Sequence, residues 1–309
     1  AKVLFFIPLG LGGVSMYFLG KEISNKQIGF VMGILYLFAP YRALDSYVRG
    51  AIAESFALAI IPLVFYFSLR FVRQTSLKNF LGVSISLAVF LLNHNIMTMF
   101  FVPVLVLWIF FWFITEKKGN IKSMVFALVI GIALAAFYIL PAYFEKNLIQ
   151  IENLKESEFI PNFRAHFVTV KQLFFDRFWG YGASTWLEGD GISFQVGWPH
   201  LWLVPIVVAA SLTSLLFSKK INKQKVTQQK LIVFMFFVFI ASVFMAHNKS
   251  TFIWEKIEVL QFAQFPWRFL SLSIFSVSLL GGFSVLQVKH KRRMPLSILI
   301  MIVTIALNW

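Results

Sequence analysis

The sequence contains no cysteine and little charge. Without cysteine it can form neither disulfides nor thiolate metal sites, which leaves the redox compartment undetermined. Of its 309 residues, 13% are charged and 59% are hydrophobic. Charged residues make up about a quarter of an average soluble protein, which needs them to cover its surface. The composition therefore excludes a soluble globular domain and indicates an integral membrane protein.

Apolar runs near the length of about 20 residues that a helix needs to cross a bilayer recur along the chain. We count ten and predict an all-α membrane protein with about ten transmembrane helices. The second run is short and a tight reversal separates the fourth from the fifth, which leaves the count open by one. The runs cover residues 3–20, 28–41, 51–69, 80–95, 96–115, 124–144, 201–217, 231–246, 269–286 and 295–309.

We expect residues 1–309 to form a single polytopic membrane domain. Because the sequence opens and stops inside apolar runs, we expect this domain to be an internal piece of a longer protein. Residues 145–200 form the longest stretch between two runs and predict one long loop on the extracytoplasmic side.

The basic residues lie on one side of the predicted spans. Alternate short loops hold 17 of the 28 Lys and Arg residues and two of the 13 Asp and Glu residues, Glu22 and Glu116. By the positive-inside rule these loops are cytoplasmic. The net charge of +15 therefore needs membrane lipids as partners and no nucleic acid. The remaining acids, the long loop and the polar motifs below are then extracytoplasmic.

Every charged residue lies at or beyond the end of a predicted span. Ion-coupled transporters keep ionisable groups near the bilayer midplane and are often built from internal repeats, and neither feature occurs in this sequence. The pattern favours a protein that works at one membrane face.

The stretch PYRALDSYVRGAIAE, residues 40–54, concentrates four charges between two apolar runs. Arg42, Asp45 and Arg49 are spaced i, i+3 and i+7, so a helix would present all three on one face. Two arginines could hold a phosphate, with Asp45 as their orienting partner. An interfacial helix whose charges pair with one another and with lipid phosphates, or a direct catalytic role for Asp45, are the alternatives. Glu54 begins the next span.

A second polar motif, LLNHN, places Asn93 and His94 at the outer end of a span. They are either a hydrogen-bonded helix end or one wall of an outer cavity, where His94 could bind phosphate or exchange a proton. In QFPWRF, Arg268 lies where the chain re-enters the membrane and faces either lipid phosphate or the same cavity. We predict that Arg42, Asp45, Arg49, His94 and Arg268 line one outward-facing cavity.

The long loop contains FFDRFWGYGASTWLEGDG, in which Asp176 and Asp190 stand among aromatic residues and glycines. Aromatic rings beside carboxylates suit a sugar, and they equally suit the aromatic belt of a membrane protein. The extracytoplasmic histidines lack the spacing of a zinc helix, so no metal site is predicted. The sequence requires no particular cofactor and leaves open a divalent metal.

The motifs APYRALDSYVRGAIAE, LLNHN, FWGYGAS with GDGISFQVGWPH, and QFPWRF, in this order between apolar spans, resemble a family of bacterial multi-pass membrane proteins called 6-pyruvoyl-tetrahydropterin synthase-related. The architecture of that family in turn resembles the GT-C superfamily, membrane glycosyltransferases that use a polyprenyl-phosphate-linked sugar at the outer face.

The resemblance implies a protein of the bacterial cytoplasmic (inner) membrane that acts in envelope glycan assembly. Its substrate-binding residues would be Arg42, Arg49, Asn93, His94, Asp176, Asp190 and Arg268, and its catalytic carboxylates Asp45 and Glu54. In GT-C enzymes the main carboxylate usually lies in the first outer loop, which we expect upstream of this sequence. A non-catalytic scaffold and a flippase for lipid-linked substrates stay open as alternatives.

Overall fold

The computed structural model describes residues 2–145, 148, 163–184, 191–217 and 223–308. These residues form helices, and no β-strand occurs among them. The predicted all-α class is therefore confirmed for the described part of the chain. The long helices are α1 (Lys2–Ile23), α2 (Lys26–Leu37), α4 (Ile52–Arg73), α5 (Leu77–Asn93), α6 (Asn95–Glu116), α7 (Ile121–Phe144), α10 (Trp198–Phe217), α11 (Lys223–Ala246), α14 (Leu270–Ser284) and α15 (His290–Asn308).

Short helices connect the long ones, and all of them except the one that follows α14 lie on the side where the polar motifs are found. The predicted reversal between two spans falls on a single residue, His94, which ends α5 and begins α6. The short helices are α3 (Pro40–Ala43), η1 (Leu44–Val48), η3 (Phe163–His166), α9 (Val170–Phe174), η5 (Asn248–Ser250), α12 (Thr251–Lys256), α13 (Glu258–Gln261), η6 (Pro266–Phe269) and η7 (Val285–Gln287), the last following α14.

By length and composition, six described helices could cross a membrane: Val3–Ile23, Ile52–Arg73, Asn95–Glu116, Ile121–Phe144, Lys223–Ala246 and Pro266–Gln287. The pair Lys26–Leu37 and Pro40–Val48 is bent by 49° and makes a seventh if it is one span. The predicted count of ten is not confirmed. Two of the other apolar helices are shorter, and α15 carries the basic residues of KHKRR in its first turns, which shortens its apolar length.

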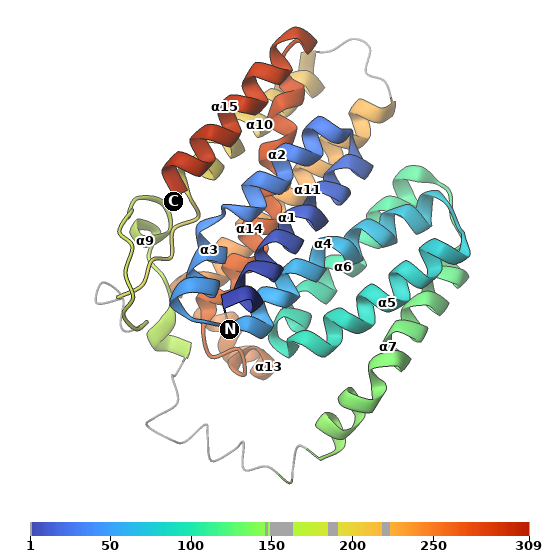
Figure 1. Cartoon of the computed structure of the whole chain (residues 1–309), viewed down its shortest axis with the longest axis vertical. Coiled ribbons are helices and arrows are strands. Elements are labelled where there is room, and N and C mark those ends of the chain that lie inside the picture. Colours follow the sequence, from blue (N-terminus) through green and yellow to red (C-terminus); the bar gives the residue numbers. More distant parts are fainter. Residues whose placement is uncertain (1, 146–147, 149–162, 185–190, 218–222, 309) are drawn as a thin grey trace.

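Helix α14 is the centre of the bundle, and all of its residues are buried. It packs against α2, α10 and α11, while α1 packs against α2 and α4 (Figure 1). A helix that is apolar all round is a buried helix. Two of its serines, Ser276 and Ser278, pair their hydroxyls within this core by donating to the carbonyls of Leu272 and Ile274 one turn earlier, whereas the buried Ser271 hydroxyl has no partner among the described residues. Helix α7 lies at the periphery against α5.

An ion-pair network joins three helices at one end of the bundle. Arg73 at the end of α4 donates from Nε to Glu116 Oε1 over 2.9 Å and from Nη1 to the carboxylate and the carbonyl of Glu22. These residues belong to the loops with the excess of Lys and Arg, so we call this the basic end. Arg73 and Glu116 end α4 and α6, whereas Glu54 lies in the first turn of α4 and His94 caps the start of α6, so Glu54 and His94 lie at the opposite end.

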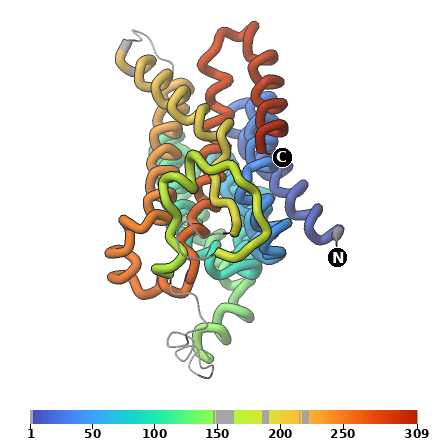
Figure 2. The backbone as a smooth tube through the Cα atoms, turned by 90° about the vertical axis from the view of Figure 1, so that its left-hand side faces the viewer, coloured from blue at the N-terminus to red at the C-terminus, as the bar shows by residue number. Residues whose placement is uncertain are grey.

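The described part of the predicted long loop lies against this opposite end. The backbone N–H of Val168 donates to Ala246 of α11, and Val196 donates to Leu173 of α9. Figure 2 shows these residues as green and yellow tubes crossing in front of the helices. The rest of residues 145–200, with Asp190, lies outside the described residues, so one continuous loop is not confirmed.

Candidate functional site

A break in helical geometry separates α2 from α4 and positions the charges of residues 40–54. Pro40 opens α3, and in η1 the chain widens to a π-helix in which Arg49 N–H donates to Leu44, five residues earlier. Gly50 has a φ of +63°, a left-handed conformation that glycine adopts without strain. This widened turn brings Arg49 back over the first turn of α4, where Glu54 lies. Isolated π-helical turns often mark functional sites.

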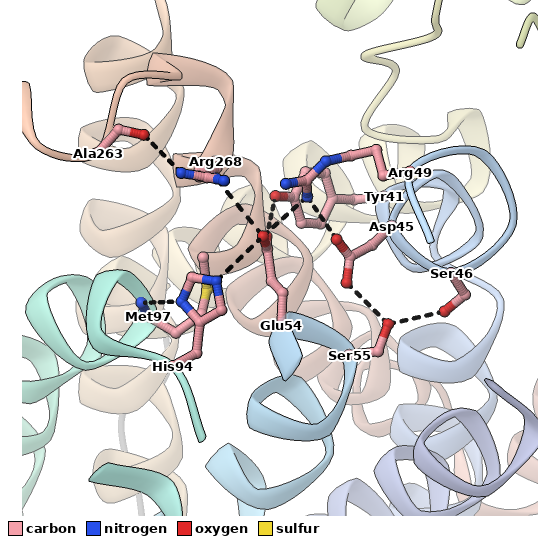
Figure 3. A network of polar contacts seen from close by, with 10 residues as sticks. All are labelled: Tyr41, Asp45, Ser46, Arg49, Glu54, Ser55, His94, Met97, Ala263 and Arg268. Atoms are coloured by element: carbon pink, nitrogen blue, oxygen red, sulfur yellow. Dashed lines mark hydrogen bonds and ion pairs between the residues drawn. The ribbon is translucent and has the colours of Figure 1, made fainter. Parts of the chain in front are cut away.

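The Glu54 carboxylate is fully buried at the centre of a group of polar side chains (Figure 3). Tyr41 Oη donates to Glu54 Oε1 over 2.5 Å, and Arg49 Nη1 donates to Oε2 over 2.9 Å. Arg268 Nε lies 3.6 Å and His94 Nε2 lies 3.9 Å from Oε2. We call Tyr41, Arg49, Glu54, His94 and Arg268 the Glu54 cluster. Residues from four separate segments thus converge on one carboxylate.

A second buried carboxylate, Asp45, is joined to the Glu54 cluster through Arg49. Arg49 Nη1 lies 2.5 Å from Asp45 Oδ1, and Ser55 Oγ donates to Asp45 Oδ2 over 2.9 Å. Ser46 and Ser55 share a further hydrogen bond of 3.0 Å. Both oxygens of each carboxylate therefore have a partner, as buried charges require.

The nitrogen-bearing side chains of the Glu54 cluster are more accessible than the two carboxylates. The side chains of Arg49, Arg268 and His94 are 15%, 11% and 17% exposed, whereas those of Asp45 and Glu54 are 0% exposed. Each of the three exposed side chains carries N–H groups, which can donate to an anion. An external ligand would meet these donors before it could reach either carboxylate.

Trp267 connects the Glu54 cluster to the described part of the long loop. The Arg49 guanidinium stands 4.6 Å from the centre of the Trp267 ring, a cation–π contact. Trp267 Nε1 donates to Ser184 Oγ over 3.2 Å, and Ser184 also hydrogen-bonds His166 Nδ1 at 2.9 Å. A change in this part of the loop can therefore act on Arg49 through one aromatic ring.

His94 is held as a neutral imidazole. Burial lowers its pKa, and the Arg268 and Arg49 guanidiniums lower it further against the opposing effect of Glu54. Its Nδ1 accepts the N–H of Met97 as the N-cap of α6, so the proton of the neutral ring is on Nε2 and faces Glu54. His94 thus caps a helix and adds one N–H donor to the site.

Arg42 makes no hydrogen bond or ion pair with the described residues of the Glu54 cluster, although it is near enough to Asp45 for their charges to interact. The contacts therefore do not support its predicted place beside Arg49 in one cavity. Its side chain is buried, donates from Nη2 to the carbonyl of Pro8 over 2.7 Å, and stands 4.9 Å from the Tyr36 ring. The spacing i, i+3, i+7 assumed a regular α-helix, whereas the wider turn of η1 alters the phase between Arg42 and the residues that follow.

The remaining predicted residues are spread over other parts of the structure. Asn93 donates to Val89 in its own helix over 2.6 Å. Asp176 lies 3.9 Å from Lys171 in the loop. Neither makes a hydrogen bond or ion pair with the Glu54 cluster within the described residues, and Asp190 lies outside them. A divalent metal gains no site here either: the described residues contain no group of three or more His, Asp or Glu side chains placed to hold one.

Four residues of the site were not predicted: Tyr41, Ser46, Ser55 and Trp267. Tyr41 is spaced i, i+4 and i+8 with Asp45 and Arg49, the spacing of neighbours on one helical face. Trp267 stands beside Arg268 in QFPWRF, a place that equally suits an aromatic side chain at the membrane interface. Ser55 carries no sequence signal of its own.

A family comparison defines the relationship of this chain to known proteins. The family model described as a 6-pyruvoyl-tetrahydropterin synthase related domain, a membrane protein, matches residues 1–309. The chain belongs to this family. The predicted family resemblance is thereby confirmed, and the protein is a membrane protein. The GT-C part of the resemblance is not shown.

A relative of this family member occurs in Lactococcus lactis subsp. cremoris (strain MG1363) under the name "Uncharacterized protein". It is 25% identical over an alignment of 232 residues, which covers 71% of this chain and 35% of the relative. The chain therefore spans about a third of the length of the relative that it matches.

Proposed function

We propose that this member of the family is a membrane glycosyltransferase-like protein that binds a polyprenyl-phosphate-linked sugar at the extracytoplasmic face. It would act in envelope glycan assembly in the bacterial inner membrane. The observation that carries the proposal is the partly exposed set of donors, Arg49, Arg268 and His94, at the end of the bundle opposite the basic loops.

The two guanidiniums suit a phosphate or pyrophosphate group. Arginine donates in pairs to phosphate oxygens, and a charge-assisted hydrogen bond of this kind contributes about 1.5 to 3 kcal/mol. In a sugar transfer the leaving phosphate gains negative charge, which fixed donors stabilise most effectively where water is excluded. Arg49 and Arg268 would bind this group, and the neutral His94 would add its Nε2–H.

Glu54 and Asp45 hold the cations in place before substrate binds. Both carboxylates are buried and fully hydrogen-bonded, so neither can act as a base in this arrangement. A phosphate that accepts hydrogen bonds from Arg49 would free one carboxylate oxygen. That oxygen could then take the proton of an acceptor hydroxyl as the new glycosidic bond forms and the bond from the sugar to phosphate breaks.

Binding of a polyprenyl-phosphate analogue to the full-length protein in detergent tests the proposal. We expect Arg49→Lys and Arg268→Lys each to weaken binding about tenfold or more, because lysine keeps the charge but loses the planar pair of donors. Arg164→Lys is the matched control, since Arg164 pairs with Glu255 on the exposed side of the same end. Equal affinity of both variants and the parent would reject the phosphate site.

A non-catalytic scaffold is the second candidate, and the charge balance of the site favours it. Two arginines face two carboxylates, and every carboxylate oxygen has a partner without a ligand. Such a network could serve to fix the packing of α4, α6 and α14. In that case Arg268→Lys would lower the thermal unfolding midpoint while the analogue binds neither the parent nor the variant.

A further inference from the structure

The described part of the long loop packs on Trp267, the aromatic residue that contacts Arg49. We call residues 163–184 and 191–197 the outer segment. Trp267 is 2% exposed, and its ring centre lies 5.5 Å from that of Phe194 in the outer segment and 6.3 Å from that of Tyr41 in the Glu54 cluster. The indole ring is therefore held between the outer segment and the site.

The hydrogen bonds of Ser184 fix the edge of this ring. An indole N–H can only donate, so Trp267 Nε1 donates to Ser184 Oγ over 3.2 Å. The one hydroxyl hydrogen of Ser184 then goes to His166 Nδ1, which lies 2.9 Å away and accepts it. His166 is itself buried, with its ring centre 4.8 Å from that of Phe265. Ser184 is thus oriented by the outer segment and in turn orients Trp267.

The Arg49 guanidinium is held at one corner and on one face. Its Nη1 donates to both Asp45 and Glu54, and its centre stands 4.6 Å from the centre of the Trp267 ring. Nε and Nη2, which share one edge of the planar group, make no hydrogen bond to any described residue. Such an edge offers two parallel N–H donors to one oxyanion. Because the ion pairs fix only the Nη1 corner, the ring determines the tilt of the free edge.

We propose that Ser184 and Trp267 are positioning residues, through which the outer segment sets the direction of the free Arg49 edge. When the Ser184 contact is lost, the indole is no longer fixed and the guanidinium loses the ring that covers one of its faces. The consequence for phosphate binding rests on the proposed function. The position and accessibility of Arg49 do not depend on it, so the two can be tested separately.

The rate at which Arg49 reacts with phenylglyoxal, an arginine-selective reagent, tests the proposal without a ligand. The full-length protein in detergent is treated with the reagent, and modification of each arginine is followed by peptide mass spectrometry. Ser184→Ala should raise the rate at Arg49 about threefold, the change expected when a cation–π contact is lost. Trp267→Leu removes the ring itself and should raise the rate at least as much. Ser184→Thr keeps the hydroxyl and should react like the parent.

Two controls make the result specific. Ser193→Ala is the matched variant, because the Ser193 hydroxyl is buried in the outer segment and has no partner among the described residues. It should leave the Arg49 rate unchanged. Arg292, exposed in the first turns of α15 at the basic end, should react equally in every variant.

Three results would overturn the proposal. They are an Arg49 rate that Ser184→Ala leaves unchanged, the same rise in Ser184→Thr as in Ser184→Ala, and a rise at Arg292 equal to that at Arg49. A polyprenyl-phosphate analogue should also protect Arg49 in the parent, and less well in Ser184→Ala. Absence of protection in the parent would count against the proposed function, while the rates without ligand still decide whether Ser184 and Trp267 position Arg49.

Discussion

Arg49 Nη1 lies 2.5 Å from Asp45 Oδ1 and 2.9 Å from Glu54 Oε2, so one guanidinium joins two carboxylates that are both fully buried. Asp45 belongs to η1 and Glu54 to the first turn of α4. Arg49 therefore ties η1 to the start of α4. The same side chain is partly exposed, and the proposed phosphate would bind there. Stability and ligand binding depend on one residue.

Replacing Arg49 by alanine should strongly destabilise the protein. Removing one partner of a buried ion pair costs about 3 to 5 kcal/mol, because the remaining charge stays buried without compensation. The thermal unfolding midpoint of the detergent-solubilised protein measures this loss. Arg49→Ala combined with Glu54→Gln should recover part of it, since one of the two carboxylates that lose their Arg49 partner is then neutral. A midpoint for Arg49→Ala within about one degree of that of the parent would show that the ion pairs of Arg49 do not stabilise the fold.

His94 should make the stability of the protein depend on pH. Because burial lowers its pKa in the folded state, the unfolded chain binds more protons near the ordinary histidine pKa of about 6.5. Stability is then fully present above that pH and is lost as the pH falls below it. Unfolding midpoints measured between about pH 5 and pH 8 should show this decrease.

The matched variant for the pH dependence is His94→Asn, whose side-chain oxygen can still accept the Met97 N–H at the start of α6. We expect a smaller decrease in the midpoint below about pH 6.5 than in the parent. An identical pH profile would assign the dependence to other groups, such as His166, whose pKa burial also lowers.

Much of the site was within reach of the sequence, and the error over Arg42 has one physical cause. Asp45, Arg49, His94 and Arg268 were selected because charges and amides stand out at the ends of apolar runs. The role expected of Arg42 failed because it assumed the period of an α-helix, and no local sequence pattern identifies a π-helical turn. Tertiary contacts alone show that Arg42 turns toward Pro8 in α1.

The number of spans shows a second limit of the sequence. Ten apolar runs are present in the sequence, but a run can cross the membrane as one span only if it forms a sufficiently long continuous helix. The bend of 49° after Leu37 divides one apolar run between two helices. Because α15 begins at His290, its first turns are basic and its apolar part is short. The bend falls at Pro40, which opens α3, and a count of apolar residues does not report the effect of a proline on helix direction.

Alanine at Gly12 should force the Arg42 guanidinium to move, and that move is costly because Arg42 is buried and hydrogen-bonded to Pro8. A Cβ at Gly12 would lie 2.5 Å from Arg42 Nη1 and 2.7 Å from Nη2. Crowding of this kind costs about 1 to 3 kcal/mol, so Gly12→Ala should lower the unfolding midpoint. Gly10→Ala, two residues earlier in α1, has nothing within 4 Å and should leave the midpoint unchanged or raise it through its better helix propensity. Equal midpoints for the two variants would contradict the placement of Arg42.

The orientation of the bundle rests on the excess of Lys and Arg at the basic end and can be tested directly. Because this chain has no cysteine, single cysteines introduced into it can be labelled without a background from its own residues. A membrane-impermeant thiol reagent added to intact cells should label Tyr181→Cys, at an exposed position of the loop beside the Glu54 cluster. It should label Lys118→Cys, exposed between α6 and α7, only after the membrane is opened. Labelling of Lys118→Cys in intact cells would place the basic end outside, and the Glu54 cluster could then meet no extracytoplasmic substrate.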